Sequence, residues 1–301
     1  MFELEIVLAP TDLSEGSRSA LPFAAHLAAA FDAELHLLYV NELHSDPSKA
    51  RELPSSEEVR ASLDAEVGAL LERLEGIGGG ELRTKTVELR AVEAAPAIVD
   101  YADEVGADLI VMGTHGRRGL GRLFLGSVTD TVLRHTSCPV LTVRHEVEIS
   151  PSEQGRILAA IDLDATSQRV VEAATRLSAW SGAEVELLHV VELPHHPVVY
   201  EAFPELPEIG FEELEDEAKS RLESICSESG LDPRRSRCTV KVGSPAEVIL
   251  DEIEADKPDL VVVASHTRGG LDRALLGSVA ERVVQRSSSP VMVLPGGAEP
   301  E

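Results

Sequence analysis

The chain has 301 residues, of which 43% are hydrophobic, and this is enough to build cores for two domains of ordinary size. It carries 27 Lys and Arg against 53 Asp and Glu, and the net charge of −26 argues against nucleic acid as the main partner, because binding to a phosphate backbone relies on cationic side chains. No apolar run approaches the roughly 18 to 20 residues that span a bilayer, which argues against a membrane protein.

The charge pattern has two readings that the composition leaves open. A strong acidic excess keeps a protein soluble where salt screens its self-repulsion, as in a halophile. The basic residues are 22 Arg and five Lys, which equally suits an acidic protein from a GC-rich genome. The first residues, MFELEIVLAPTD, resemble a strand and not the basic start of a signal peptide, so we expect a cytoplasmic protein.

In chain order, short apolar runs alternate with segments of helical periodicity. The expected strands of the first half are residues 4–10, 34–40, 82–89, 108–113 and 139–144. Helical spacing covers residues 14–31 and 55–76, and Ser55 or Ser56 with Glu58 can cap the second of these helices. Strands that are apolar throughout are covered on both faces. The pattern therefore predicts a doubly wound α/β fold with a parallel sheet, and ligands of such folds lie at the carboxyl ends of the strands.

The second half of the chain repeats the first. DAELHLLYV at residue 32 matches GAEVELLHV at 182, and Asp12 aligns with Asp162. The offset is 150 residues early in the repeat and 151 late, so one residue has been gained between. We predict two tandem domains, residues 1–147 and 154–297, each with a Rossmann-like sheet of five parallel strands.

Neither the cysteines nor the paired histidines have the spacing of a known metal site. Cys138, Cys226 and Cys238 cannot all pair with one another, and they form neither a CxxC motif nor a cluster with zinc spacing. Cys138 precedes a proline at an expected strand start, so we expect a small core residue, and structural roles for the other two. His195 and His196 lie in a Pro-rich segment that differs between the repeats. Adjacent histidines could bind a metal, but no carboxylate stands at a defined ligand spacing, and we interpret the segment as an exposed loop.

The stretch VMGTHGRRGLGRLFLGSV, residues 111–128, is the strongest functional signal. It joins an expected strand to an expected helix through a glycine-rich loop, and no Asp or Glu occurs between Asp108 and Asp130. Gly113 and Gly116 would let the backbone approach an anion closely, and Gly126 opens a helix whose first N–H groups favour negative charge. The alternative is a surface loop whose arginines pair with acids elsewhere.

The spacing Gly113-x2-Gly116-x9-Gly126-Ser127, with PTDLSE after the first strand and CPVLTV at the end, resembles the universal stress protein family in both halves of the chain. The resemblance implies strands in the order 3-2-1-4-5, pairing of domains through the last strand, and ATP as the ligand. For the first half it implies ATP contacts by Pro10, Thr11, Asp12, Val40, Met112, Gly113, Thr114, His115, Gly116, Arg117, Gly126, Ser127, Val128 and Thr129. For Asp12 a turn-forming role stays open.

The second half departs from this pattern. Gly113 and Gly116 become Ala264 and Thr267, and each added Cβ narrows the approach of a phosphate. Pro10 and Thr11 also change, to Ala160 and Ile161. What remains of a weaker second site is Asp162, Val190, Gly277 and Ser278. We therefore expect ATP in the first domain, and weak or no binding in the second, which then serves as a built-in dimer partner.

Three functions compete at this point. The first is an ATP-sensing regulatory protein of a stress response, with Mg²⁺ accompanying the phosphates and an intramolecular pseudo-dimer or a homodimer as the assembly. The second is a slow ATPase or a nucleotidyl-transfer enzyme, but PTDLSE stands where such transferases have HxGH or SGGxDS, and no catalytic residue is evident. The third is a dimerisation scaffold that binds no nucleotide.

Overall fold

The computed structural model describes residues 4–43, 54–76, 81–114, 125–144, 155–164, 167–192, 209–265 and 276–296. The chain divides into two compact units. Unit 1 comprises Met1–Ile149, Thr267–Leu276 and Pro290–Pro295, and unit 2 comprises Ser150–His266, Gly277–Ser289 and Gly296–Glu301. The units differ from the two sequence repeats because a strand from the end of the second repeat belongs to unit 1.

Unit 1 is built on a sheet whose strands are parallel except at one edge. They are β1 (Ile6–Thr11), β2 (Glu34–Glu42), β3 (Arg83–Ala91), β4 (Leu109–Gly113), β5 (Val140–Val143) and β10 (Val291–Pro295), in the order β3-β2-β1-β4-β5-β10. Only β10 runs antiparallel, beside β5. The chain passes from β1 to β2 on one side of β1, while β4 lies on the other side. The strand order therefore reverses between β1 and β4.

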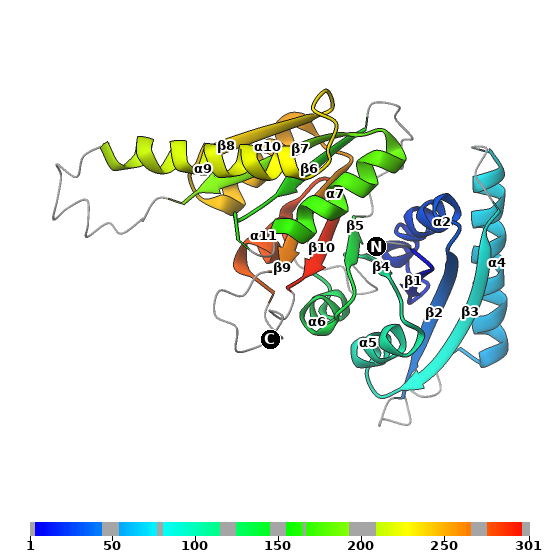
Figure 1. Ribbon diagram of the computed structural model, residues 1–301. Helices are drawn as coiled ribbons and strands as arrows, with labels where there is room; N and C mark the ends of the chain where they lie inside the picture. The colour runs from blue at the N-terminus through cyan, green and yellow to red at the C-terminus, as the bar shows by residue number, and fades with distance from the viewer. Residues whose placement is uncertain are drawn as a thin grey trace. The chain divides into compact units, whose positions relative to one another are not determined.

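Five helices cover the sheet of unit 1 within the described residues: α1 (Glu15–Arg18), α2 (Leu21–Ala30), α4 (Ser56–Gly76), α5 (Ala94–Val105) and α6 (Ser127–His135). In Figure 1 the strands β1 to β3 lie between α2 with α4 on one side and α5 with α6 on the other, in agreement with the contacts of α2 with α4 and of α5 with α6. The α/β class with a parallel sheet is as predicted.

The helical segment predicted over residues 14–31 is two helices. It breaks after Arg18 because Pro22, in the first turn of α2, lacks an N–H group, and its ring would collide with the carbonyl four residues earlier. The cap predicted for α4 is present, and Ser55 provides it. Glu58 Oε2 accepts hydrogen bonds from the Ser55 N–H and hydroxyl, each at 2.8 Å, while the Glu58 N–H donates to Ser55 Oγ at 3.3 Å.

Unit 2 has the strands β6 (Arg156–Ala160), β7 (Glu184–Val191), β8 (Ser236–Val242) and β9 (Leu260–Ser265), in the order β9-β6-β7-β8. Its helices are α7 (Ser167–Ser181), α9 (Ile209–Glu228), α10 (Pro245–Asp256) and α11 (Ser278–Arg286). Local geometry repeats between the units. Leu13 and Leu163, each in the turn after the first strand of its unit, have left-handed φ angles of 62° and 58°. The sequence repeat is therefore also a repeat of backbone conformation.

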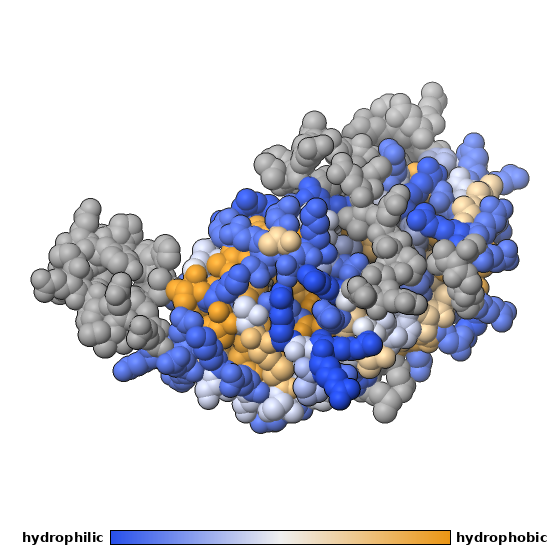
Figure 2. Space-filling view, turned by 90° about the horizontal axis from the view of Figure 1, so that it is seen from above, coloured by the Kyte–Doolittle hydropathy of each residue, from blue (hydrophilic) through white to orange (hydrophobic). Residues whose placement is uncertain are grey.

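The cores follow from the apolar strands. In β1 every residue from Val7 to Thr11 is buried, and Leu109 to Met112 of β4 are buried as well, because helices cover both faces of the sheet. Figure 2 shows hydrophilic residues over much of the visible surface. Among the described residues, no helix combines the length and the apolar content that crossing a membrane requires.

A buried histidine links β2 to α5. His36 is 2% exposed, its Nδ1 lies 3.0 Å from the Tyr101 hydroxyl, and its Nε2 lies 2.9 Å from Glu34 Oε2. Because a carboxylate can only accept and a tyrosine hydroxyl can donate, neutral His36 with its proton on Nε2 satisfies both neighbours. The hydrogen bond from His36 lowers the pKa of Glu34 below its ordinary value of 4.5.

This contact predicts a pH dependence of stability. Since the pKa of Glu34 is lower in the folded chain, its contribution is complete above about pH 4.5 and is lost as the pH falls through the folded pKa. We expect the free energy of unfolding to fall less steeply between about pH 6 and pH 3 in Glu34→Gln than in the parent chain. Urea unfolding across this range measures it, and parallel curves for the two chains would contradict the prediction.

Candidate functional site

The candidate site of unit 1 lies at the carboxyl ends of β1 and β4. The two strands are neighbours, and the order of the sheet reverses between them. In open α/β sheets the loops on the two sides of such a point diverge, which leaves a crevice that ligands use. Three segments meet at this edge: the turn after β1, the end of β4 and the start of α6.

The turn after β1 is held by its own side chains. Thr11 Oγ1 lies 3.0 Å from Ser17 Oγ in α1, and it accepts a hydrogen bond of 3.0 Å from the Leu13 N–H. Asp12 Oδ1 accepts hydrogen bonds from the N–H and the hydroxyl of Ser14, and Ser14 caps α1. Asp12 thus performs the turn-forming role. Its predicted contact with a ligand stays a prediction.

The end of β4 is packed against α1 without space for a side chain. A Cβ atom on Gly113 would lie 2.1 Å from the carbonyl oxygen of Gly16, far inside the contact distance of real atoms. The motif signal at Gly113 thus has a cause within the protein: backbone meets backbone at this position. Sequence reasoning missed Gly16. The signal available for it was that Gly16 and Gly113 change together, to Thr166 and Ala264, in the second repeat.

The start of α6 presents backbone N–H groups with no side-chain cap. Gly126 is the N-cap residue, with φ −60° and ψ 139°, and it has no side chain that could accept from the first turn. The first helical bond that reaches it is from the Asp130 N–H to the Gly126 carbonyl, at 2.9 Å. Helical geometry therefore leaves the N–H groups of Ser127, Val128 and Thr129 without partners inside the helix, at the positive end of its dipole.

The two hydroxyls of this first turn differ. Ser127 is an exposed residue. Thr129 is buried, and its Oγ1 donates to the Gly113 carbonyl at 2.9 Å, so its only hydroxyl proton is used inside the protein. Of the two, Ser127 is therefore the one whose hydroxyl can reach an external anion.

One acidic residue stands near these N–H groups. Asp130, in the first turn of α6, is bound by Arg134 one turn later, whose Nε lies 3.1 Å and 3.0 Å from the two carboxylate oxygens. This ion pair offsets a negative charge that would otherwise repel an incoming anion.

The remaining predicted contacts divide into apolar walls and residues outside the description. Pro10 and Met112 are buried in β1 and β4, and Val40 is half-buried in β2. Thr114 is buried, its N–H donates to the Val143 carbonyl, and its carbonyl accepts from the Gly126 N–H at 2.8 Å. That last bond joins the strand end to the start of α6. The predicted contacts His115, Gly116 and Arg117 lie outside the described residues.

Two hydroxyl links of unit 1 cannot form at the corresponding edge of unit 2. The bond between Thr11 and Ser17 has no equivalent, because Ile161 stands where Thr11 would be, and Ala280 replaces the Thr129 hydroxyl. Gly277 still caps α11, with φ −60° and ψ 145°, and Ser278 is exposed as Ser127 is. Asp162 is exposed, and Val190 is buried in β7. The helix terminus is thus retained while its surroundings have changed.

A cavity of about 170 Å³ lies at the opposite end of the strands of unit 2, at the amino ends of β6, β7 and β8. Its charged walls are largely paired with each other. Arg237 binds both Glu186 and Asp256, and Arg156 lies 3.6 Å from Asp256. We interpret these charged side chains as an ion-pair network and not as a ligand site. No group of three or more potential metal ligands occurs among the residues that the structure describes.

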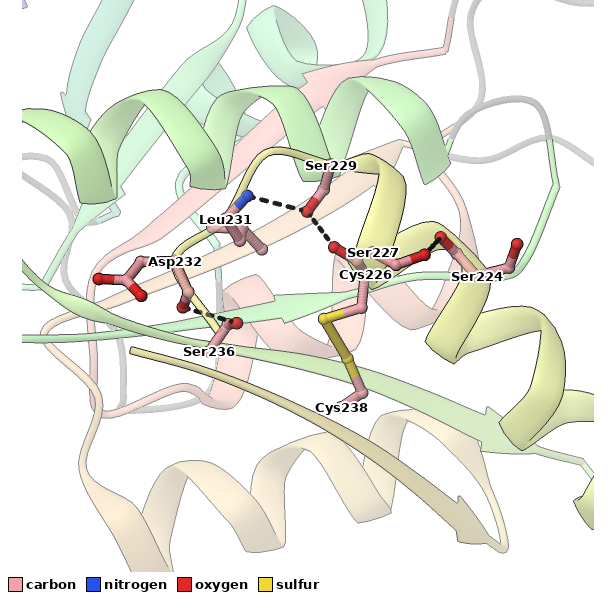
Figure 3. The surroundings of a disulfide bond; sticks show 8 residues. All are labelled: Ser224, Cys226, Ser227, Ser229, Leu231, Asp232, Ser236 and Cys238. Carbon is pink, nitrogen blue, oxygen red and sulfur yellow. Dashed lines mark hydrogen bonds between the residues drawn. A yellow bond between two sulfur atoms is a disulfide. The ribbon is translucent and has the colours of Figure 1, made fainter. Parts of the chain in front are cut away.

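The structure also contains a disulfide that sequence reasoning did not foresee. Cys226, near the end of α9, pairs with Cys238 in β8, as Figure 3 shows, and their Cα atoms are 6.9 Å apart. Cys138 is free and buried, as expected, and burial raises the pKa of its thiol. Cys226 and Cys238 are 12 residues apart, on either side of a helix end and a turn, and no sequence motif marks such a pair. Only the fold shows that the two cysteines meet.

Comparison with known proteins agrees with the fold. The universal stress protein family matches twice, at residues 3–144 and 154–295. A universal stress protein of Mycolicibacterium smegmatis is 29% identical over 299 residues, 96% of each chain, and one of Mycobacterium tuberculosis is 31% identical over 223 residues, 73% of this chain and 72% of that protein. A crystal structure of a universal stress protein from Archaeoglobus fulgidus has a TM-score of 0.67 at 23% identity and covers 97% of this chain and 98% of its own.

Fold and comparisons define a tandem α/β protein whose candidate site lies at the switch point of a parallel sheet. The chain belongs to the universal stress protein family and contains two of its domains in series.

Proposed function

We propose that unit 1 binds ATP and that the protein acts as a nucleotide-dependent regulator in a stress response. The observation that carries this proposal is the uncapped start of α6 beside the switch point of the sheet. A helix start whose N-cap is glycine offers unpaired N–H groups and a positive dipole end, and this combination binds phosphate. Family membership supports the proposal.

The shape of the edge suits a nucleotide better than a free phosphate. The N–H groups of α6 and the exposed Ser127 take the phosphates, while half-buried Val40 at the end of β2 provides an apolar contact for the base. The turn of Pro10, Thr11 and Asp12 lies between them in the sheet order, where the ribose would lie. The arginines of the segment after β4, in a chain of net charge −26, favour several phosphate charges over one.

In this proposal Mg²⁺ would be bound by the phosphates of ATP and not by protein carboxylates. Asp12 is the one carboxylate in the turn after β1, and Ser14 already binds one of its oxygens. Mg²⁺ in nucleotide sites keeps several waters and binds substrate phosphates. Its coordination would therefore come from ATP and water, with Asp12 positioning the turn.

Calorimetric titration of the full chain with ATP tests the proposal, and we expect one site per chain. Unit 2 contributes no equal site because Ala264, Ile161 and Ala280 have altered its edge. At a ligand concentration of 100 times Kd, binding should also raise the free energy of unfolding by about 2.7 kcal/mol.

The other outcomes of this experiment separate the competing functions. Two equal ATP sites per chain would refute the proposal that unit 1 binds ATP more tightly than unit 2. No heat and no thermal shift with millimolar ATP would refute nucleotide binding and leave a scaffold protein. Steady release of phosphate from ATP that is abolished by Ser127→Ala would instead identify an ATPase. Titrations with ADP and AMP show how much the γ-phosphate contributes to the affinity.

A further inference from the structure

We propose that Gly113 is a positioning residue that sets the distance between the two walls of the candidate nucleotide site. The packing of Gly113 is argued from the geometry of unit 1. Its effect on ATP binding rests on the proposed function. One wall is the turn after β1, and the other is the first turn of α6. Gly113 packs closely against α1, which is bonded to the first wall, and its carbonyl accepts a hydrogen bond from the second wall.

The first contact is made with α1. The Gly16 carbonyl occupies the space that a Cβ on Gly113 would take, 2.1 Å from it, and the next nearest atoms there, at 2.9 Å and 3.2 Å, are also backbone. Backbone cannot move aside as the end of a flexible side chain can. An alanine at this position would push α1 away from β4 by about 1 Å.

That displacement would reach the turn after β1. Ser17 of α1 is bonded through its hydroxyl to Thr11, and Thr11 in turn binds the Leu13 N–H. Both hydroxyl-bearing residues are buried, at 8% and 6% exposure, so no water replaces the bond easily. The position of α1 therefore determines the position of the turn that holds Asp12.

The second contact is made with α6. The Gly113 carbonyl accepts the hydroxyl proton of buried Thr129 at 2.9 Å. The next residue, Thr114, accepts the Gly126 N–H at 2.8 Å. Two consecutive carbonyls at the end of β4 thus hold the start of α6, and the first of them belongs to the glycine that holds α1.

The second repeat changes four members of this arrangement and keeps Ser17, which aligns with Ser167. Gly113 becomes Ala264 and Gly16 becomes Thr166, while Thr11 and Thr129 become Ile161 and Ala280. Loss of nucleotide binding alone would account for changes at the predicted ATP contacts, but Gly16 is not one of them and changes together with Gly113. The joint replacement is what a single packing unit predicts.

The test compares Gly113→Ala with Gly68→Ala in the full chain. Gly68 lies in α4, where an added Cβ has no atom within 4 Å, so the second variant controls for the chemical change itself. Two readouts are used. Hydrogen exchange without ligand reports on residues 11–20 and 125–133, and calorimetry reports the Kd for ATP.

We expect Gly113→Ala to speed exchange in both segments and to weaken ATP binding roughly ten- to a hundredfold, while Gly68→Ala does neither. Unchanged exchange would overturn the inference whether or not ATP binds. Faster exchange with an unchanged Kd would overturn it as well. If the parent chain binds no ATP, the proposed function fails and with it the role in binding, while the exchange data still decide the packing claim.

Two milder variants cover a Gly113→Ala chain that does not fold. Ser17→Ala removes the link to Thr11, and Thr129→Val removes the link to the Gly113 carbonyl. Each should loosen only its own wall and still raise the Kd. Thr129→Ser keeps the hydroxyl and should restore parent affinity. A Thr129→Ser chain that binds as poorly as Thr129→Val would show that volume, and not the link, matters.

Discussion

Replacement of Ser127 by proline should weaken ATP binding by about ten- to a hundredfold while leaving α6 folded. Ser127 is the first residue of α6, where the N–H group has no partner in the helix. Proline lacks this N–H and is well tolerated at the first helical position. The preceding residue must be extended, and Gly126 already has φ −60° and ψ 139°. The substitution thus deletes the N–H group together with the side-chain hydroxyl, at small cost in structure.

The expected magnitude follows from the charge of the acceptor. A hydrogen bond to a charged group contributes about 1.5–3 kcal/mol, and each 1.4 kcal/mol corresponds to about a factor of ten in Kd. Ser127→Ala removes the hydroxyl and keeps the N–H group, so it should cost less. Calorimetric titration of the two variants separates the contribution of the backbone from that of the side chain.

Unit 2 offers the matched control. Ser278 is the first residue of α11 and follows Gly277, whose angles are nearly those of Gly126. Ser278→Pro should leave the Kd and the stoichiometry unchanged. If Ser127→Pro binds ATP as tightly as the parent chain, the phosphates are not held by the start of α6, and the proposed site is wrong.

Removal of the disulfide between Cys226 and Cys238 should lower the stability of unit 2 by about 3 kcal/mol. The bond closes a loop with a sequence separation of 12 residues, and the chain-entropy relation gives this magnitude for the constraint on the unfolded chain. The native turn has other supports, which Figure 3 shows. Ser229 Oγ donates to the Cys226 carbonyl and accepts from the Leu231 N–H, and Ser236 Oγ donates to the Asp232 carbonyl. We therefore expect a destabilised chain with an unchanged fold.

A single fluorophore makes the measurement specific. Trp180 is the only tryptophan of the chain and lies in α7 of unit 2, so its fluorescence during urea unfolding reports on that unit. Cys226→Ser with Cys238→Ser should unfold at lower urea, and a thiol reductant should shift the parent chain to the same midpoint. The reductant should not affect the double variant. A parent chain that is indifferent to reductant would show that the two thiols are not paired.

Much of the fold could be predicted because its determinants are local. The apolar run of residues 108–113 reflects a strand that is buried on both faces, and the helical spacing over 55–76 reflects a helix that is buried on one face. Both patterns can be recognised from residues that are close together in the chain. The Ser55 cap with Glu58 is likewise contained in four consecutive residues. The break in the helix after Arg18 was missed, although Pro22 is visible in the sequence, because the hydrophobic pattern continues across it.

The candidate site could be predicted in part. Gly126 and Ser127 were placed correctly at a helix start, because glycine and serine before a periodic segment are a local signal. The use of the Thr129 hydroxyl inside the protein was not foreseen. It depends on the carbonyl of Gly113, which is 16 residues away in the chain and adjacent only in the folded unit.

The sequence by itself determined the α/β class and the tandem repeat, and it predicts the segment for a phosphate site, since periodicity, self-similarity and glycine spacing are properties of the chain. Only the tertiary structure decided that Gly113 faces the Gly16 carbonyl, that Thr129 is turned inward, and that Cys226 meets Cys238. Each of these contacts joins two segments of the chain, and the number of residues between the segments does not predict how close they lie in the folded unit. Close packing in three dimensions decides which backbone and side-chain atoms share a space.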